Sequence, residues 1–193
     1  MRPNASPAGL PVWRRLCDHR RVAVPSKSPP GGSDATEDSV DFVVAAYREE
    51  GAWQVQPLPA RVADGLDALV NSLRPLPSES GSIGMVSVDE DFFVLVRVLG
   101  ADVHLLLSDV TAATDWPLAS EVVDSLELPE PDDDDERQPA GELGLLGDFG
   151  VSAMDMAVLC DDAELFPDEM LSDVAQRLGF GAAFEGAVER APV

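Results

Sequence analysis

The sequence predicts an α+β fold in which a five-stranded antiparallel sheet carries packed helices. Three observations support this prediction. Five short segments between residues 40 and 108 have the apolar content of strands. The connections among the last three are only a few residues long, which suits antiparallel neighbours. Segments with helical spacing of apolar residues lie between the second and third strands and after the fifth, where they can cover the sheet.

The first two strands are predicted to form a hairpin. Val40–Tyr47 is apolar on both faces, as expected of a central strand. Trp53–Pro57 alternates between apolar and polar residues, as a half-exposed strand does. Glu49, Glu50 and Gly51 provide the turn between them.

The next three strands are predicted to form a meander. They follow one another with turns at Asp89–Asp91 and Gly100–Asp102, and cover Ile83–Val88, Phe92–Leu99 and Val103–Ser108. Because no helix fits into these turns, each strand pairs with the next.

Two helices are predicted among or directly after the strands. Ala60–Leu73 has an apolar stripe at helical spacing and is followed by prolines. The stripe consists of Val62, Leu66, Leu69, Val70 and Leu73. A second helix is expected to open at Asp115-Trp-Pro117 and to reach about Leu126, because proline is tolerated in a first turn.

Two further helices are predicted near the C-terminus. Ser152 is placed to cap a helix that runs to about Asp161, with Asp155 at the capping-box position. Pro167 opens the last helix, and Gly179 suits a left-handed cap at its end. The order ββα-βββ-α is similar to that of longin, roadblock and profilin-like modules, which often act in protein interactions, although fold alone does not fix function.

The chain divides by composition into an arm and one domain. Residues 1–38 form a basic arm rich in Pro and Ser, which predicts disorder, unless translation starts farther downstream. Residues 39–190 are expected to form a single α+β domain. Within it, residues 129–141 are charged and punctuated by proline, as in a loop or linker.

Charge is segregated along the chain. The first 33 residues have a net charge of +5, whereas the other 160 contain 7 basic and 35 acidic residues, a net charge of −28. A body this acidic is expected to repel nucleic acid and anionic membranes, which bind to Lys and Arg. It favours basic protein partners, or serves solubility alone.

The cysteines and the hydropathy indicate a cytoplasmic protein. Cys17 and Cys160 lie 143 positions apart, which predicts no disulfide framework and two reduced thiols. No apolar run approaches the roughly 20 residues of a membrane span. The N-terminus also lacks the apolar stretch of a secretory signal.

The residues needed for metal-dependent or nucleophilic catalysis do not occur in productive patterns. A zinc deaminase requires H-x-E together with P-C-x-x-C, and neither His19 nor His104 is followed by the glutamate. A Cys–His pair in the folded part would have to join Cys160 to His104, which the pattern places in a strand as a structural residue. The chain has no G-x-S-x-G, and no phosphate loop with its lysine.

The remaining acidic motifs are interpreted as structural or solvated. Asp148-Phe-Gly150 spells the magnesium-binding tripeptide of kinases, but no catalytic loop accompanies it. Asp132–Glu136 lacks the spaced ligands of a calcium loop. Carboxylate pairs such as Asp89/Asp91 and Asp161/Asp162 are expected in so acidic a chain, although they leave a hydrolase open. We therefore assign no catalytic, cofactor-binding or metal-binding residue.

Four segments of the chain carry a resemblance to a known family: Asp41–Gly51, Asp89–Arg97, Glu164–Met170 and Arg177–Gly181. Through them, residues 40–190 resemble the tRNA adenosine deaminase-associated protein family of actinobacteria. The resemblance implies an association with a tRNA adenosine deaminase and offers no catalytic residue. We therefore expect a non-catalytic accessory or regulatory protein of that deaminase. The alternatives are a general longin-like adaptor with an unrelated partner and, less favoured by the residues, a cryptic hydrolase.

Overall fold

The computed structural model describes residues 39–132 and 134–191. The predicted basic arm, residues 1–38, lies outside the described residues. Within them, the fold is an α+β arrangement of an antiparallel sheet and five α-helices. No helix in the described part is long and apolar enough to cross a membrane.

The sheet has six strands in the order β2-β1-β3-β4-β5-β6, and every neighbouring pair is antiparallel. The strands are β1 Val40–Glu49, β2 Ala52–Leu58, β3 Ser82–Val88, β4 Phe92–Leu99, β5 Asp102–Leu107 and β6 Ala140–Gly141. The prediction of five strands was therefore wrong by one. The sixth strand has two residues, too few to give an alternating pattern, and it lies at the end of the charged segment 129–141.

The predicted hairpin and meander are confirmed. Glu50 and Gly51 both have positive φ between the paired residues Glu49 and Ala52, as in the two-residue turns that best match strand twist. Because β2 and β3 are each antiparallel to β1, they are parallel to each other, and the chain between them crosses one face of the sheet.

That crossing contains α1, Leu66–Leu73, which begins later than predicted. Ala60–Ala63 forms a separate 3₁₀ turn, and Gly65 is extended before the helix starts. The side chain of Glu121 in α2, Pro117–Ser125, accepts a hydrogen bond from the Leu66 backbone N–H at 2.6 Å. A carboxylate from another helix thus satisfies one of the free amides at the start of α1.

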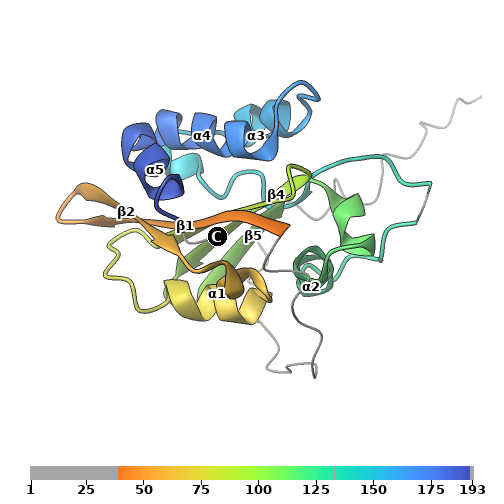
Figure 1. Cartoon of the computed structure of the whole chain (residues 1–193), viewed down its shortest axis with the longest axis horizontal. Coiled ribbons are helices and arrows are strands. Elements are labelled where there is room, and N and C mark those ends of the chain that lie inside the picture. The colour runs from red at the N-terminus through yellow and green to blue at the C-terminus, as the bar shows by residue number, and fades with distance from the viewer. Residues whose placement is uncertain (1–38, 133, 192–193) are drawn as a thin grey trace, which may run out of the picture.

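Helices cover both faces of the sheet (Figure 1). One face packs against α1 and α2, Pro117–Ser125, and the other against α3, Ala153–Cys160, α4, Pro167–Leu178, and α5, Gly181–Val188. Along β4, Phe92, Val94 and Val96 point to the first layer, while Phe93 and Leu95 point to the second. This double coverage explains why the central strands are almost continuously apolar.

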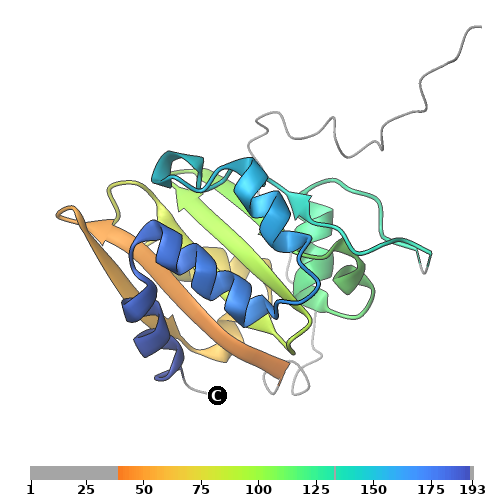
Figure 2. The same cartoon turned by 90° about the horizontal axis from the view of Figure 1, so that it is seen from above.

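The chain passes from one helical layer to the other around the β5 edge of the sheet (Figure 2). Arg137 holds this crossing in place: its Nε donates to Asp109 at 2.6 Å, and an Nη donates to the Asp91 carbonyl oxygen at 2.7 Å. Asp109 is buried, so this ion pair is partly shielded from water. The charged segment is therefore attached at its end rather than being a free linker.

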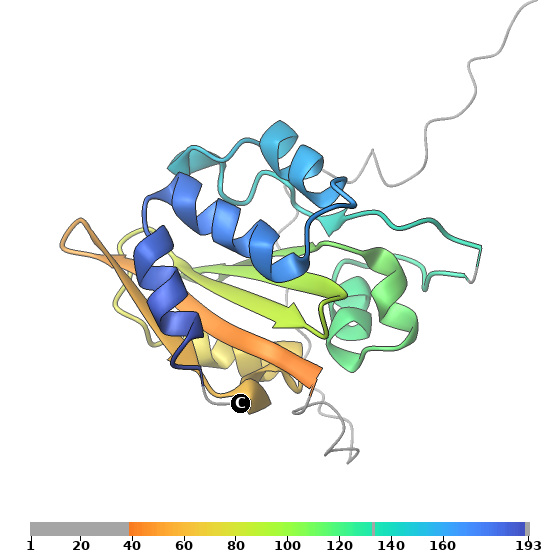
Figure 3. The ribbon, with the colours of Figure 1, turned by 45° about the horizontal axis from the view of Figure 1, so that its top comes forward.

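The C-terminal layer contains one helix more than predicted. Gly179 has a φ of +87° and ends α4, as its left-handed cap predicted. Only one residue later the chain starts α5, which packs Phe184 against Phe42 of β1 in an edge-to-face contact. The two glycines of α5 weaken its helical signal, which is why it was missed. Figure 3 shows α3, α4 and α5 together on this face.

Candidate protein-docking site

The structure does not pair the two residues considered for nucleophilic catalysis. His104 lies on β5 with its Nδ1 2.7 Å from a carboxylate oxygen of Glu142. Cys160 lies at the end of α3, and burial raises the pKa of its thiol to about 12. A thiol with so high a pKa is almost entirely protonated at neutral pH and is a poor nucleophile.

The Asp148-Phe-Gly150 tripeptide is a structural clamp on the sheet. Arg97, a buried residue of β4, donates both Nη groups to the Asp148 carboxylate at 2.5 and 2.7 Å. Its guanidinium also lies 4.5 Å from the centre of the Phe149 ring. The hydrogen bond from Arg97 is the main cause that lowers the pKa of Asp148. Two of the three residues are therefore used to hold a loop against β4.

The acidic candidates do not form a metal site. Within residues 39–132 and 134–191, no three His, Cys, Asp or Glu side chains lie close enough together to hold a metal ion. Asp91 instead pairs with Arg137, and Asp135 accepts a hydrogen bond from the Asp132 backbone. Asp161 and Asp162 are exposed beside each other at the end of α3.

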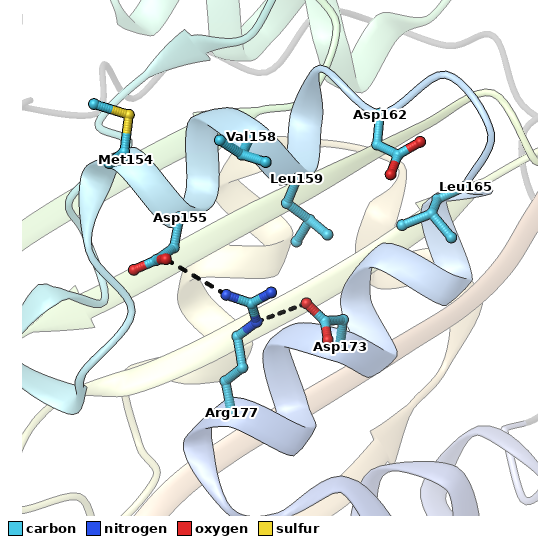
Figure 4. A pocket seen from close by; sticks show the side chains of 8 residues that line it. All are labelled: Met154, Asp155, Val158, Leu159, Asp162, Leu165, Asp173 and Arg177. Carbon is cyan, nitrogen blue, oxygen red and sulfur yellow. Dashed lines mark hydrogen bonds and ion pairs between the residues drawn. The ribbon is translucent and has the colours of Figure 1, made fainter.

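A groove of about 320 Å³ runs along α3 and α4 (Figure 4). Apolar and charged residues line it together: Met154, Asp155, Val158, Leu159, Asp162, Leu165, Asp173 and Arg177. In Figure 4, Asp155 and Leu159 point from α3 toward α4, while Met154 and Val158 lie higher, on the shoulder of α3. The groove therefore has an apolar shoulder, and charged and apolar side chains line it together between the helices.

The apolar shoulder is unusually exposed. Met154 and Val158 expose 73% and 65% of their surface, and Phe166, just before α4, exposes 53%. In α3 the sequence Ala-Met-Asp-Met-Ala-Val-Leu-Cys has one charged residue, Asp155, and only Met156 and Leu159 are buried. A surface helix normally places polar residues on its outer face. Here Met154 and Val158 leave much of the outer face apolar.

The capping of α3 fixes the position of its exposed residues. The Ser152 hydroxyl accepts a hydrogen bond from the Asp155 N–H, and the Asp155 carboxylate accepts one from the Ser152 N–H, as the sequence predicted. The hydrogen bond from the Ser152 side chain is the largest cause that lowers the pKa of Asp155.

Arg177 of α4 joins the two walls of the groove. Its Nε donates to Asp173 at 2.7 Å, and one Nη lies 3.6 Å from Asp155 of α3. The guanidinium is the groove's only cation among its lining residues, and it is shared between two carboxylates. The residues that line the groove therefore have a net negative charge.

The surrounding chain is more acidic still. Between Arg137 and Arg177 there is no basic residue, whereas nine residues are acidic. These are Glu142, Asp148, Asp155, Asp161, Asp162, Glu164, Asp168, Glu169 and Asp173. A surface that is both apolar and acidic suits a partner with apolar and basic groups.

Sequence reasoning did not find this site. It identified Ser152 and Asp155 as capping residues but attached no role to Met154, Val158 or Phe166. A signal was present, since α3 has too many apolar residues for one buried stripe and is followed by three acids within four residues, Asp161, Asp162 and Glu164. Only the packing shows which apolar residues stay outside the core.

The model of one protein family matches residues 41–181, a span that includes the whole groove. The chain belongs to the Rv3753c-like tRNA adenosine deaminase-associated protein family. A relative, Protein Rv3753c of Mycobacterium tuberculosis, is 38% identical over 152 residues, which cover 77% of this chain and 88% of the relative. No solved structure matches the chain.

Membership confirms the predicted resemblance and places the chain in a family named for association with tRNA adenosine deaminase. The likeness of the element order to longin modules stays a prediction.

Proposed function

We propose that this protein is a non-catalytic accessory or regulatory protein of a tRNA adenosine deaminase, and that it acts by protein–protein binding through the α3–α4 groove. The observation that carries the proposal is the exposure of Met154 and Val158 on the shoulder of that groove. Grouped apolar side chains with a polar rim are a common feature of protein interaction surfaces.

The charge of the body supports a basic partner. An enzyme that acts on tRNA needs Lys and Arg on its surface to contact phosphates. An acidic protein is attracted to such a surface, and complementary charge raises the rate at which the two meet. Docking on or near the RNA-binding surface would let the accessory protein change access of tRNA to the enzyme.

The arrangement of polar residues supports a binding role over a catalytic one. His104, Arg97 and Asp148 each have a partner that holds the fold together. Cys160 is partly buried against the apolar core, and this burial raises the pKa of its thiol. Nucleophile, base and charge stabiliser have to converge on one site for catalysis, and these residues are instead engaged separately.

Co-purification tests the proposal. Tagged full-length protein, co-expressed with the tRNA adenosine deaminase of its own organism, should retain the enzyme at low salt and release it as salt rises. Deletion of its gene should change the extent of adenosine editing in tRNA. If the deaminase is not retained at low salt, or if editing is unchanged on deletion, the proposed association is wrong.

A further inference from the structure

The walls of the α3–α4 groove are helices whose backbone groups are already paired. At the start of α3, Ser152 and Asp155 cap each other, and at the start of α4 the Phe166 N–H donates to the Glu169 carboxylate at 3.0 Å. An extended peptide needs a strand edge to pair its own backbone. A helix pairs its backbone internally, so it can lie in this groove without leaving amides and carbonyls unpaired.

The dimensions and spacing of the groove also suit a helix. At 1.5 Å per residue, the part of α3 that lines the groove, Met154 to Leu159, spans about 8 Å, and Asp173 to Arg177 of α4 about 6 Å. Two turns of a third helix would cover this length. Met154 and Val158 are four residues apart, on one side of α3, and can pack against apolar residues at i, i+3 or i+4, and i+7 of the occupant.

Charge at one end of the groove is left unbalanced. Asp155 and Asp173 share Arg177, but Asp161, Asp162 and Glu164 form no ion pair with any residue of the described part. The Asp162 carboxylate accepts only a local hydrogen bond from the Glu164 N–H at 3.0 Å. This acidic turn between α3 and α4 would attract Lys or Arg on the occupant.

From these features we infer that the α3–α4 groove receives a basic amphipathic helix of the partner protein. The apolar stripe of that helix packs on Met154 and Val158, and its basic residues lie over the acidic turn at Asp161 and Asp162. The inference rests on the proposed function in taking this face as a protein-docking site, but it does not depend on the identity of the partner.

A synthetic peptide tests the inference on the full-length protein. The probe is a fluorescent 14-residue peptide of Leu and Lys with leucines at i, i+3, i+4 and i+7, and the comparison is a scrambled peptide of the same composition. Fluorescence anisotropy at about 0.1 M salt measures both affinities. We expect the amphipathic peptide to bind at least about tenfold more tightly, because only its leucines form one face.

Paired variants locate the binding. The double variant Met154→Ser, Val158→Ser should bind the amphipathic peptide about tenfold more weakly than the natural protein does. Leu99 is another exposed apolar residue (42% exposed), and Leu99→Ser should change the affinity for the peptide less than twofold. A second pair of double variants tests the charge. The variant Asp161→Asn, Asp162→Asn should lose more affinity for the peptide than the variant Asp132→Asn, Asp134→Asn, which removes the same charge elsewhere. Urea unfolding of each variant shows that the fold is kept.

Equal affinity for the two peptides, or equal effects of groove and control variants, would overturn the inference. The outcome is separable from that of the proposed function. If the peptide binds in the groove but the deaminase is not retained, the helix-binding groove stands and the partner is wrong. If the deaminase binds and the groove variants do not affect the peptide, the partner stands and the inference fails.

Discussion

Helices α1 and α3 have the same length of eight residues and cover opposite faces of one sheet, but they use their apolar residues differently. In α1, Leu66, Leu69, Val70 and Leu73 are all buried. In α3 only Met156 and Leu159 are fully buried, while Met154 and Val158 face solvent. The sheet accounts for the apolar residues of α1 but only for part of those of α3. The surplus on α3 is the basis of the proposed docking surface.

The largest difference between the two helices should appear in stability. Leu69→Ala removes a fully buried side chain and should lower the free energy of unfolding by about 2–5 kcal/mol. Val158→Ala on α3 should change it by about 0.5 kcal/mol or less, because that side chain is mostly exposed. Urea unfolding measures both. Similar losses in the two variants would mean that Val158 belongs to the core, and the comparison would fail.

A smaller effect is expected from the polar clamp that fixes the loop before α3. Arg97→Leu removes the hydrogen bonds to Asp148 and to the carbonyl oxygens of Ser80 and Leu145. We expect the free energy of unfolding, measured in urea, to fall by about 1–3 kcal/mol. The effect is limited because Asp148 is exposed enough to be hydrated again.

Arg48→Leu is the matched control for this change. Arg48 also lies over an aromatic ring, that of Trp53 at 5.6 Å, but among residues 39–132 and 134–191 it donates to the exposed Gly51 carbonyl oxygen alone. Arg48→Leu should therefore lower the free energy of unfolding by about 0.5 kcal/mol or less. If Arg97→Leu is as stable as Arg48→Leu, the contact of Arg97 with Asp148 does not hold the loop before α3 against the sheet.

The smallest effect concerns pH. The pKa of Asp148 is lowered below 3.8 in the folded protein, mainly by the hydrogen bond from Arg97. Its contribution to stability is therefore complete above the pKa of an unfolded Asp and is lost as the pH falls through the lower folded value. Asp148→Asn should be less stable than the natural protein near pH 6, and the gap should narrow below about pH 4. A gap that stays constant from pH 6 to pH 2 in urea unfolding would contradict the pairing.

Much of the fold could be predicted because the decisive patterns are local. The apolar strands Val40–Tyr47 and Phe92–Leu99 and the stripe of α1 follow from periodicity, and the caps at Ser152 and Gly179 follow from backbone chemistry. The features that were missed depend on tertiary structure or are too short to give a signal. The two residues of β6 pair with Leu106 and Leu107, more than thirty positions earlier, and the separate 3₁₀ turn before α1 breaks a stripe that looks continuous.

The candidate site was harder to predict than the fold. Arg97 lies within an apolar strand and meets Asp148, 51 positions later, so neither residue alone indicates the clamp. The role of Gly141 likewise depends on a residue far away in the sequence. It has a φ of +104°, and a Cβ at this position would overlap the carbonyl oxygen of Leu105. In α3, Met154 and Met156 look alike in the sequence. Packing against the sheet decides that Met156 is buried and Met154 is exposed.

The most direct test of the α3–α4 groove as a docking site is the affinity of the purified tRNA adenosine deaminase for three full-length proteins. These are the natural chain, the double variant M154S/V158S and the control variant Leu99→Ser. Isothermal titration at low salt should give an affinity for the groove variant at least about tenfold weaker than for the other two, at unchanged urea midpoints. Equal affinity for all three proteins, or no binding to the natural chain, would contradict the account.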